Sequence, residues 1–203
     1  MKNLLLETIR CEAGKLQNLE WHQERAGRSC RTVFAASHNI DLRHIAVPPE
    51  ARVGLFKCRV LYNTHIEKVE FIPYSIRLVR KLRLIQADDL EYSHKFADRE
   101  EIEALFDRRS PADDILIVKN GLITDTSYAN IALFDGSAWH TPASPLLAGT
   151  RRASLIAAGK LTPADIPPHK LPEYREVRLI NAMMALEEGP RLHPEDIIQI
   201  TKN

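Results

Sequence analysis

Residues 121–131, GLITDTSYANI, decide how the rest of the chain is interpreted. Two apolar residues lead into a run of small hydrogen-bonding side chains around Asp125, and a second apolar run follows Asn130. A tight turn would normally use Gly, Pro or Asn-Gly, and a plain strand would alternate apolar and polar residues. Taken alone, the stretch is therefore predicted to be a hydrogen-bonded turn between two strand-like segments.

The composition is that of an ordinary globular chain. It has 203 residues, of which 44% are hydrophobic and 27% charged, enough for one large domain or two small ones. A net charge of +1 gives no electrostatic case for nucleic acid or an anionic membrane. No apolar run approaches the roughly 20 residues of a membrane span. Three widely spaced cysteines favour a reducing compartment over a disulfide frame or a metal site, so we expect a cytoplasmic protein: Cys11, Cys30 and Cys58.

The first part of the chain has the pattern of a small α+β subdomain. A strand is expected over 3–10, a helix over about 19–36 with Asn18 as its cap, and a hairpin over 54–72. Three polar residues of the helix share one face at i, i+3 and i+7: His22, Arg25 and Ser29.

After Pro73, which marks a hinge, the pattern is richer in strands. A strand with alternating apolar residues is expected from Ile76 to Leu84. The other expected elements are helices over 99–108 and 151–159, strands over 114–119, 130–134, 137–141 and 176–180, and an edge strand over 197–200. This order lacks βαβ regularity, so the sequence predicts an α+β fold with two subdomains, 1–76 and 77–203.

Several common site motifs do not occur. The chain has no P-loop, no dinucleotide fingerprint and no G-x-S-x-G elbow, and its eight histidines show no H-E-x-x-H spacing. The basic run Arg77, Arg80, Lys81 and Arg83 alternates with apolar residues and is interpreted as a solvated strand face.

Three separated pieces nevertheless belong together. Lys95 stands in EYSHKFADR, Asp125 stands in the opening stretch, and PLLAGTRRASLI brings a loop to Gly149-Thr150 at the start of a helix. Each piece has an ordinary explanation alone: a surface lysine, a turn and a helix start. The exposed amides of a helix N-terminus, with a hydroxyl beside them, would also suit an anion.

In this order the pieces resemble the class IV aminotransferases, the fold-type IV enzymes that use pyridoxal phosphate. LLETIR and the H-x-x-R pair at His22 and Arg25 match the family's opening pattern, and SHKFADR matches the stretch around its Schiff-base lysine. TDTSYAN is similar to the T-E-G-x-x-S-N block, PLLAGTRR to L-P-G-I-T-R, and EVRLINAM to a late strand on the phosphate side. The resemblance runs from residue 4 to about residue 188.

The resemblance implies roles for the central residues. Lys95 would form the Schiff base with pyridoxal phosphate, and its freed amine would then act as the general base. Asp125 takes the place of the motif's glutamate, whose negative charge raises the pKa of the ring nitrogen. Thr126 and Ser127 would orient Asp125 and the Lys95 amine.

The remaining cofactor contacts are also implied by the resemblance, and most of them lie in the subdomain 77–203. Leu146 would pack on the cofactor ring. Arg25 would supply the positive charge that binds the phosphate, and four further residues would contact the phosphate from two sides: Gly149, Thr150, Asn181 and Ala182. Three weaker candidates for the substrate come from the first subdomain: His22, Arg59 and Tyr62, the last at the place of an arginine in D-amino-acid enzymes.

The sequence departs from the family pattern in three places. The family's usual N-terminal segment is expected to be shortened, because the chain begins at the first family strand. Asp125 is one methylene shorter than glutamate, and the glycine in Leu147–Thr150 is shifted by one place relative to P-G-I-T. The fold expected is therefore a two-subdomain, D-amino-acid aminotransferase-like fold with a shortened start, forming a homodimer with the active site near the subunit interface.

Two chemistries and one non-catalytic role are compatible with these residues. The Asn181-Ala182-Met183 stretch and the E-T-I-R opening are more similar to lyases that convert 4-amino-4-deoxychorismate to 4-aminobenzoate and pyruvate. A branched-chain or D-amino-acid aminotransferase shares the same lysine, carboxylate and phosphate site, so the residues alone do not separate the two. A relative that binds the cofactor without turnover is the third alternative.

Overall fold

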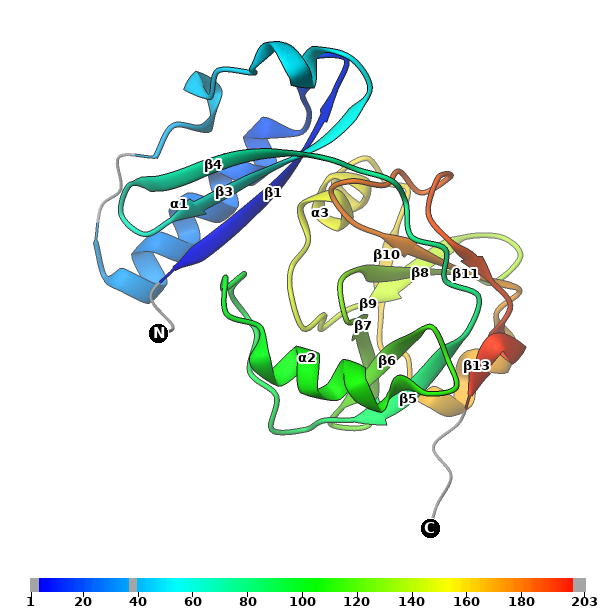
Figure 1. Cartoon of the computed structure of the whole chain (residues 1–203). Helices are drawn as coiled ribbons and strands as arrows, with labels where there is room; N and C mark the ends of the chain where they lie inside the picture. The colour runs from blue at the N-terminus through cyan, green and yellow to red at the C-terminus, as the bar shows by residue number, and fades with distance from the viewer. Residues whose placement is uncertain (1–3, 37–39, 199–203) are drawn as a thin grey trace. The chain divides into compact units, whose positions relative to one another are not determined.

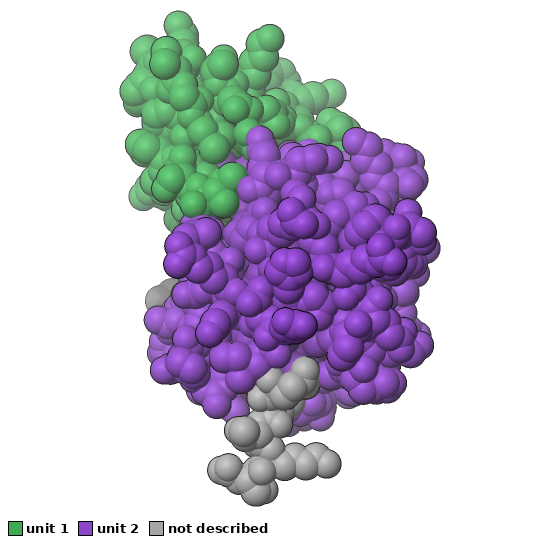
Figure 2. Space-filling view, turned by 90° about the vertical axis from the view of Figure 1, so that its right-hand side faces the viewer, with its two compact units in different colours: residues 1–76, 94–98 green, residues 77–93, 99–203 purple. Residues whose placement is uncertain are grey.

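The computed structural model of the chain describes residues 4–36 and 40–198 (Figure 1). The chain divides into two compact units (Figure 2). Unit 1 contains residues 1–76 and 94–98, and unit 2 contains residues 77–93 and 99–203. The sequence assigned 94–98 to the second subdomain, but this short segment belongs to unit 1. Its backbone pairs with the start of the first strand, through Leu6 N to Lys95 O at 2.8 Å and Ala97 N to Leu4 O at 2.9 Å.

Unit 1 is an antiparallel sheet with one long helix on one of its faces (Figure 1). The sheet order is β2-β1-β3-β4. Its elements are β1 (Leu5–Glu12), β2 (Lys15–Leu16), α1 (Leu19–Phe34), the 3₁₀ turns η1 (Leu42–His44) and η2 (Pro49–Arg52), β3 (Leu55–Tyr62) and β4 (Ile66–Pro73). The tight β1–β2 turn is possible because Ala13 and Gly14 both adopt positive φ.

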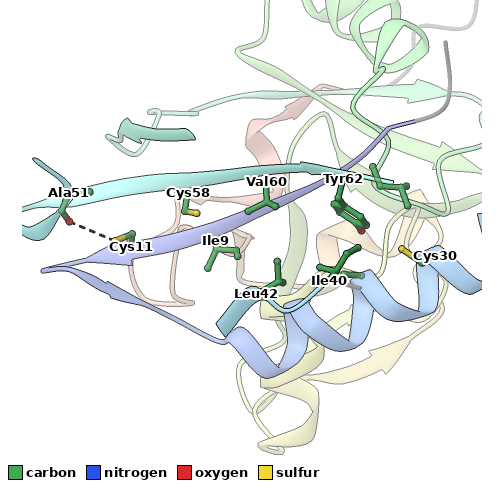
Figure 3. Close-up of a cluster of buried hydrophobic side chains, with 11 residues drawn as sticks. Ile9, Cys11, Cys30, Ile40, Leu42, Ala51, Cys58, Val60 and Tyr62 are labelled. Carbon is green, nitrogen blue, oxygen red and sulfur yellow. Dashed lines mark hydrogen bonds between the residues drawn. The ribbon is translucent and has the colours of Figure 1, made fainter. Parts of the chain in front are cut away.

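The core of unit 1 lies between α1 and the sheet (Figure 3). Every second residue of β1 is buried on the core side: Leu5, Glu7, Ile9 and Cys11. The α1 face predicted from the sequence is buried as well, with His22, Arg25 and Ser29 all inside. Asn18 is the N-cap residue of α1, as predicted, but its backbone is left-handed (φ 54°) and its side chain makes no capping hydrogen bond.

Unit 2 is built on a larger mixed sheet, of nine strands among the described residues. Its main path is β10-β9-β8-β7-β6-β5-β13, with β11 paired to β8 and β12. The elements are β5 (Leu82–Gln86), α2 (Glu100–Phe106), η3 (Asp107–Arg109), β6 (Asp114–Lys119), β7 (Leu122–Thr126), β8 (Asn130–Phe134), β9 (Trp139–Pro142), α3 (Thr150–Ala157), β10 (Thr162–Ala164), η4 (Pro168–Glu173), β11 (Glu176–Ile180), β12 (Arg191–Leu192), η5 (Pro194–Asp196) and β13 (Ile197–Ile198). Within the described ranges, no helix has the length and apolar composition to cross a bilayer.

The strand expected from Ile76 begins only at Leu82. The backbone N–H groups of Arg80 and Lys81 donate to the Asp113 carboxylate instead of a neighbouring strand, at 2.7 and 3.0 Å. Leu78 is 63% exposed, so the alternation of apolar residues does not continue a buried face there. The expected tail strand is present as β13, which pairs in parallel with β5; residues 199–200 of that prediction lie outside the described residues.

The stretch quoted at the outset is a strand, a turn and the start of a second strand. Asp125 lies in β7, and β8 begins at Asn130. These two residues are the registered pair between the two antiparallel strands. Directly opposed residues point to the same face of a sheet, so the turn brings the Asn130 amide to the Asp125 carboxylate.

Candidate active site

A buried charge cluster lies at the middle of β1 in unit 1. Glu7 occupies a core-facing position and is fully buried. Arg25 of α1 donates to both of its oxygens, from Nε to Oε1 at 2.8 Å and from Nη2 to Oε2 at 2.5 Å. His22, one turn earlier on the same face, places Nδ1 2.6 Å from Oε2. The cluster is therefore a bidentate ion pair with a histidine as its third member.

The charges of this cluster follow from burial and pairing. Burial alone would raise the pKa of Glu7, but the Arg25 charge and the hydrogen bonds from both partners outweigh it and lower the pKa to about 2. Burial lowers the pKa of His22, so this ring is neutral and donates its Nδ1–H to Glu7. Glu7 is thus an ionised carboxylate whose charge is balanced by Arg25 within unit 1.

Lys95 belongs to the same unit and is half-buried. Its segment runs beside the first residues of β1, where Phe96 forms an isolated bridge with Leu5. The ammonium of Lys95 contributes to the lowered pKa of His22, which puts its charge near the Glu7 cluster. Next to Lys95, the His94 ring lies 3.4 Å from the Ser29 hydroxyl of α1.

Two of the weaker substrate candidates are engaged inside unit 1. Tyr62 is fully buried in the core, its side chain hydrogen-bonds to Ser29, and burial raises its pKa. Arg59 donates to Glu70 on the neighbouring strand at 2.9 Å. Strand alternation turns Tyr62 into the core of unit 1. Arg59 points to the other side of the sheet and pairs with Glu70.

In unit 2 the Asp125 carboxylate is buried and held by neutral donors. Asn130 Nδ2 donates to Oδ1 at 2.8 Å, and the backbone N–H of Leu147 donates to Oδ2 at 2.8 Å. Burial raises the pKa of Asp125 to about 7, although these bonds and the Arg152 charge act in the opposite direction. No ion pair joins Asp125 to a side chain within the described part of the chain, in contrast to Glu7.

The hydroxyls of Thr126 and Ser127, which were predicted to orient Asp125 and the Lys95 amine, hydrogen-bond to other groups in this structure. The Thr126 hydroxyl donates to Ala129 O at 3.1 Å and accepts from Ala129 N at 3.1 Å. The Ser127 hydroxyl donates to buried Asp114 at 3.0 Å. The Thr126 hydroxyl closes the β7–β8 turn and the Ser127 hydroxyl ties that turn to β6, whereas Asn130 and Leu147 donate to Asp125.

The loop before α3 comes close to Asp125. Leu146 is buried, and Gly149 is the residue that precedes the helix. A Cβ on Gly149 would lie 2.0 Å from Asn130 Oδ1, so a side chain at 149 would displace the Asn130 amide. Thr150, the first helical residue, is also buried. The N-terminus of a helix carries a partial positive charge and presents backbone N–H groups, which suit an anion.

Asn181 and Ala182 follow β11 in a turn. The Asn181 carbonyl oxygen on its side chain accepts from Met183 N at 2.8 Å, and its Nδ2 donates to Tyr128 O at 3.4 Å. Asn181 therefore connects its own turn to the turn that follows Asp125. Ala182 is half-buried beside it.

The residues present suit pyridoxal phosphate. Lys95 offers a primary amine for the aldehyde. Asp125 is a buried carboxylate with no ion-pair partner among the described residues, and a protonated ring nitrogen would provide one. Glu7, Asn130 and Arg152 belong to the two clusters and were missed from the sequence. Two signals were present: a glutamate among the core-facing positions of β1, and an asparagine at the first residue of the strand after the Asp125 turn.

The fold and these residues define a two-unit α+β enzyme of the fold-type IV class. A model of the amino-transferase class IV family matches residues 93–186. A structure described as "a putative 4-amino-4-deoxychorismate lyase", from Haemophilus somnus 129PT, is 34% identical, with a TM-score of 0.86 over 92% of this chain and 99% of that chain. A protein of Haemophilus influenzae described only as uncharacterized is 36% identical over 90% of this chain and 98% of that protein.

The chain belongs to the class IV aminotransferase family, whose members are pyridoxal-phosphate-dependent enzymes. More distant structures share the fold. The branched-chain amino acid aminotransferase of Escherichia coli has a TM-score of 0.70 at 11% identity, over the whole of this chain and 80% of that chain. A hypothetical aminotransferase from Mycobacterium tuberculosis in its PLP-bound form has a TM-score of 0.78 at 16% identity, over 98% of this chain and 82% of that chain.

Proposed function

We propose that this enzyme is a 4-amino-4-deoxychorismate lyase that works through a Schiff base between Lys95 and pyridoxal phosphate. The observation that carries the choice of substrate is the 34% identity, over nearly the full length, to the Haemophilus somnus protein described as such a lyase. The likeness to the branched-chain enzyme rests on fold alone at 11% identity. A class IV aminotransferase of the branched-chain or D-amino-acid type is the second candidate.

Lys95 has two tasks in this proposal. Its amine would hold the cofactor's aldehyde, and the freed amine would act as the base that takes the proton from the carbon bearing the substrate nitrogen. The cofactor supplies an electron sink for the pair of electrons left on that carbon. Those electrons would form the new ring double bond as the neighbouring ring carbon–oxygen bond breaks, so that enolpyruvate leaves and the ring becomes the aromatic 4-aminobenzoate. The proton returns to the enolpyruvate carbon, which gives pyruvate.

Asp125 would accept a hydrogen bond from the protonated ring nitrogen. A buried carboxylate without a contacting cation is costly to ionise, and its pKa of about 7 expresses that cost. A cationic N–H placed against it would favour the ionised carboxylate, and the carboxylate would favour the protonated ring. The pairing supports the role inferred from the motif, in spite of the shorter aspartate side chain.

The phosphate would be held by the first turn of α3 together with Arg25. Gly149 and Thr150 supply backbone N–H groups at the positive end of the helix. The Glu7 carboxylate already pairs with Arg25 on two of its atoms, and fixes the direction of this guanidinium. Leu146 and the Asn181-Ala182 turn would complete the cofactor's surroundings.

The cofactor step is tested by spectroscopy on purified protein. The protein incubated with pyridoxal phosphate should be yellow, and borohydride should fix the cofactor on a peptide that contains Lys95. Lys95→Ala should lose this label, whereas the matched variant Lys68→Ala, on an exposed strand position, should keep it. A wild-type protein that takes up no cofactor, or a label on another lysine, would contradict the proposal.

The reaction step is tested by product analysis. Aminodeoxychorismate should give 4-aminobenzoate and pyruvate in equal amounts with wild-type enzyme and none with Lys95→Ala. Amine exchange between a keto acid and a panel of L- and D-amino acids, without 4-aminobenzoate, would instead identify an aminotransferase. Cofactor labelling with no turnover of either kind would identify a non-catalytic relative.

A homodimer with the active site near the subunit interface is part of the proposal. Among the described residues, β4 is an edge strand of the unit 1 sheet, and its Val69 and Ile72 are 37% and 38% exposed. Such an edge suits association with a second copy. Sedimentation analysis should give twice the 23.1 kDa chain mass, and Val69→Lys should lower the dimer fraction.

The cytoplasm is the compartment we propose. Cys11, Cys30 and Cys58 are all free and buried, although Cys11 and Cys58 lie on neighbouring strands. Free thiols are typical of a reducing compartment. Fractionation of cells that make a tagged chain would test the assignment, and recovery in a secreted fraction would contradict it.

A further inference from the structure

Asn130 links the Asp125 carboxylate to the loop before α3. Its amide nitrogen donates to Asp125 Oδ1 at 2.8 Å and to the carbonyl oxygen of Leu147 at 2.8 Å. Leu147 closes the ring of contacts, because its own N–H donates to Asp125 Oδ2 at 2.8 Å. Three residues from three segments thus hold one another through three hydrogen bonds, and both N–H bonds of the Asn130 amide are used.

The shape of the loop depends on the same amide. A Cβ at position 149 would approach Asn130 Oδ1 to 2.0 Å, so only glycine leaves room for the amide there. The backbone of Gly149 has an ordinary φ of −68°, which any residue adopts. Close approach to Asn130, and not backbone strain, is therefore the reason for glycine at this position.

The length of Asp125 fits this ring of contacts. A glutamate would carry its carboxylate about 1.5 Å further from the strand, past the donors that Asn130 and Leu147 now direct at it. The shorter side chain found here and the close loop are matched to each other. The departure from the family's glutamate is thus accommodated by the loop.

The other end of the loop is held by a buried arginine. Arg152 Nη2 donates to Pro142 O at 2.7 Å, and its Nε donates to the Thr141 hydroxyl at 3.3 Å. The groups that face Asp125 are Asn130 from β8, the amides of Leu146 and Leu147, and the Arg152 charge from α3. The hydrogen-bonding side chain in this set is Asn130.

We propose that Asn130 is a positioning residue, which holds the Asp125 carboxylate and the Leu147–Gly149 loop in the one arrangement that receives the cofactor's ring nitrogen. The inference rests on the proposed function for its cofactor part. Its structural part concerns Asp125 and the loop alone and stands without the cofactor.

Asn130→Ala removes the amide, and Thr124→Val is its matched control. Thr124 is a buried residue of β7 next to Asp125, and its hydroxyl donates to Ile117 O at 3.0 Å, away from the carboxylate. Both variants lose buried hydrogen bonds of a similar kind. A purely structural role for Asn130 would therefore give the two variants similar properties.

Two measurements are made on each protein. Absorbance titration of the apoprotein should show pyridoxal phosphate binding weakened about 10- to 100-fold in Asn130→Ala, as for the loss of a hydrogen bond to a charged group, and near wild type in Thr124→Val. Carboxyl NMR titration of cofactor-free protein should show Asp125 taking up its proton at higher pH in Asn130→Ala only.

The outcomes separate this inference from the proposed function. An Asn130→Ala protein that is folded, binds the cofactor like wild type and leaves the Asp125 titration unchanged would overturn the inference. If wild-type protein binds no cofactor, the proposed function fails, and the Asp125 titration alone decides the role of Asn130. If Asn130→Ala does not fold, Gly149→Ala, which displaces the amide without removing it, takes its place in both measurements; wild-type values there would also overturn the inference.

Discussion

Glu7 in unit 1 and Asp125 in unit 2 are both buried carboxylates on strands, and their surroundings shift the two pKa values in opposite directions. Glu7 in unit 1 receives both arms of Arg25 and the ring N–H of His22, and its pKa falls to about 2. Asp125 in unit 2 receives an amide N–H and a backbone N–H, and its pKa rises to about 7. Both carboxylates are almost fully buried, so the opposite pKa shifts of Glu7 and Asp125 follow from the Arg25 guanidinium, which contacts Glu7.

The comparison separates a structural charge from one prepared for a ligand. Glu7 has its counter-charge and hydrogen-bond donors within the protein, and it holds the side chains of Arg25 and His22 in position. Asp125 is held in place by neutral donors but is not neutralised by contact, which is the arrangement expected where a cationic ligand atom binds. Sequence motifs alone drew attention to Asp125 and not to Glu7.

Breaking the unit 1 pair should have the largest effect. Glu7→Gln leaves the Arg25 charge buried without its carboxylate, and should lower the free energy of unfolding by about 3–5 kcal/mol. Urea unfolding followed by circular dichroism measures this. As a control, Glu12→Gln, whose side chain is 45% exposed at the end of the same strand, removes a partner of Arg10 and should cost less than Glu7→Gln. Equal losses in the two variants would show that burial does not set the strength of the Glu7 pair.

Neutralising the unit 2 carboxylate should affect rate before it affects fold. Asp125→Asn keeps a side chain of the same size, but a neutral amide cannot hold the ring proton. We expect retained cofactor and a loss of kcat of roughly 10²- to 10³-fold, as for other groups that stabilise developing charge. Steady-state kinetics with aminodeoxychorismate measures this. An unchanged kcat would refute the role of Asp125 at the ring nitrogen.

The pH dependence of stability should separate the two carboxylates. Because the pKa of Asp125 is raised, the folded state binds the Asp125 proton more tightly than the unfolded state does. Asp125 therefore stabilises the folded state at low pH. This contribution, on the order of a few kcal/mol, is lost as pH rises from about 4 to about 7. Glu7 acts in the opposite sense, and its contribution is lost as pH falls from about 4.5 to about 2.

The measurement is the difference between cofactor-free wild type and Asp125→Asn, unfolded in urea at several pH values from 4 to 8. Subtraction removes the effect of His22, whose lowered pKa makes stability rise with pH over part of the same range. Wild type should lose stability relative to the variant as pH rises. A difference that does not vary with pH would mean that Asp125 has an ordinary pKa in the folded protein.

The smallest effect is expected from the partly exposed ion pair of unit 1. Arg59 and Glu70 have the chemistry of the Arg25–Glu7 pair, but both side chains keep 29% of their surface in solvent. Arg59→Gln should leave the unfolding midpoint and kcat/KM unchanged within error. A clear rise in KM with unchanged stability would instead indicate that Arg59 binds the substrate.

The sequence predicted most of the elements because their apolar periodicity is strong, as in β1, α1 and the β3–β4 hairpin. It failed at Ile76–Lys81, where a side chain, Asp113, takes the backbone N–H groups that a strand would have used. Asp125 and Lys95 were singled out by motif. Glu7 was missed because its burial depends on which face of β1 meets α1, and Asn130 because its contact depends on strand register.

The placement of residues 94–98 in unit 1 means that the chain passes between the two units three times, at 76/77, 93/94 and 98/99. A fragment that ends at Ile76 would retain α1 and the four-stranded sheet but would lack the backbone that hydrogen-bonds Leu4 and Leu6. Those strand positions would become an open edge, prone to self-association. The two units are therefore poor candidates for separate expression, and a split or circularly permuted version of the enzyme should keep residues 94–98 together with β1.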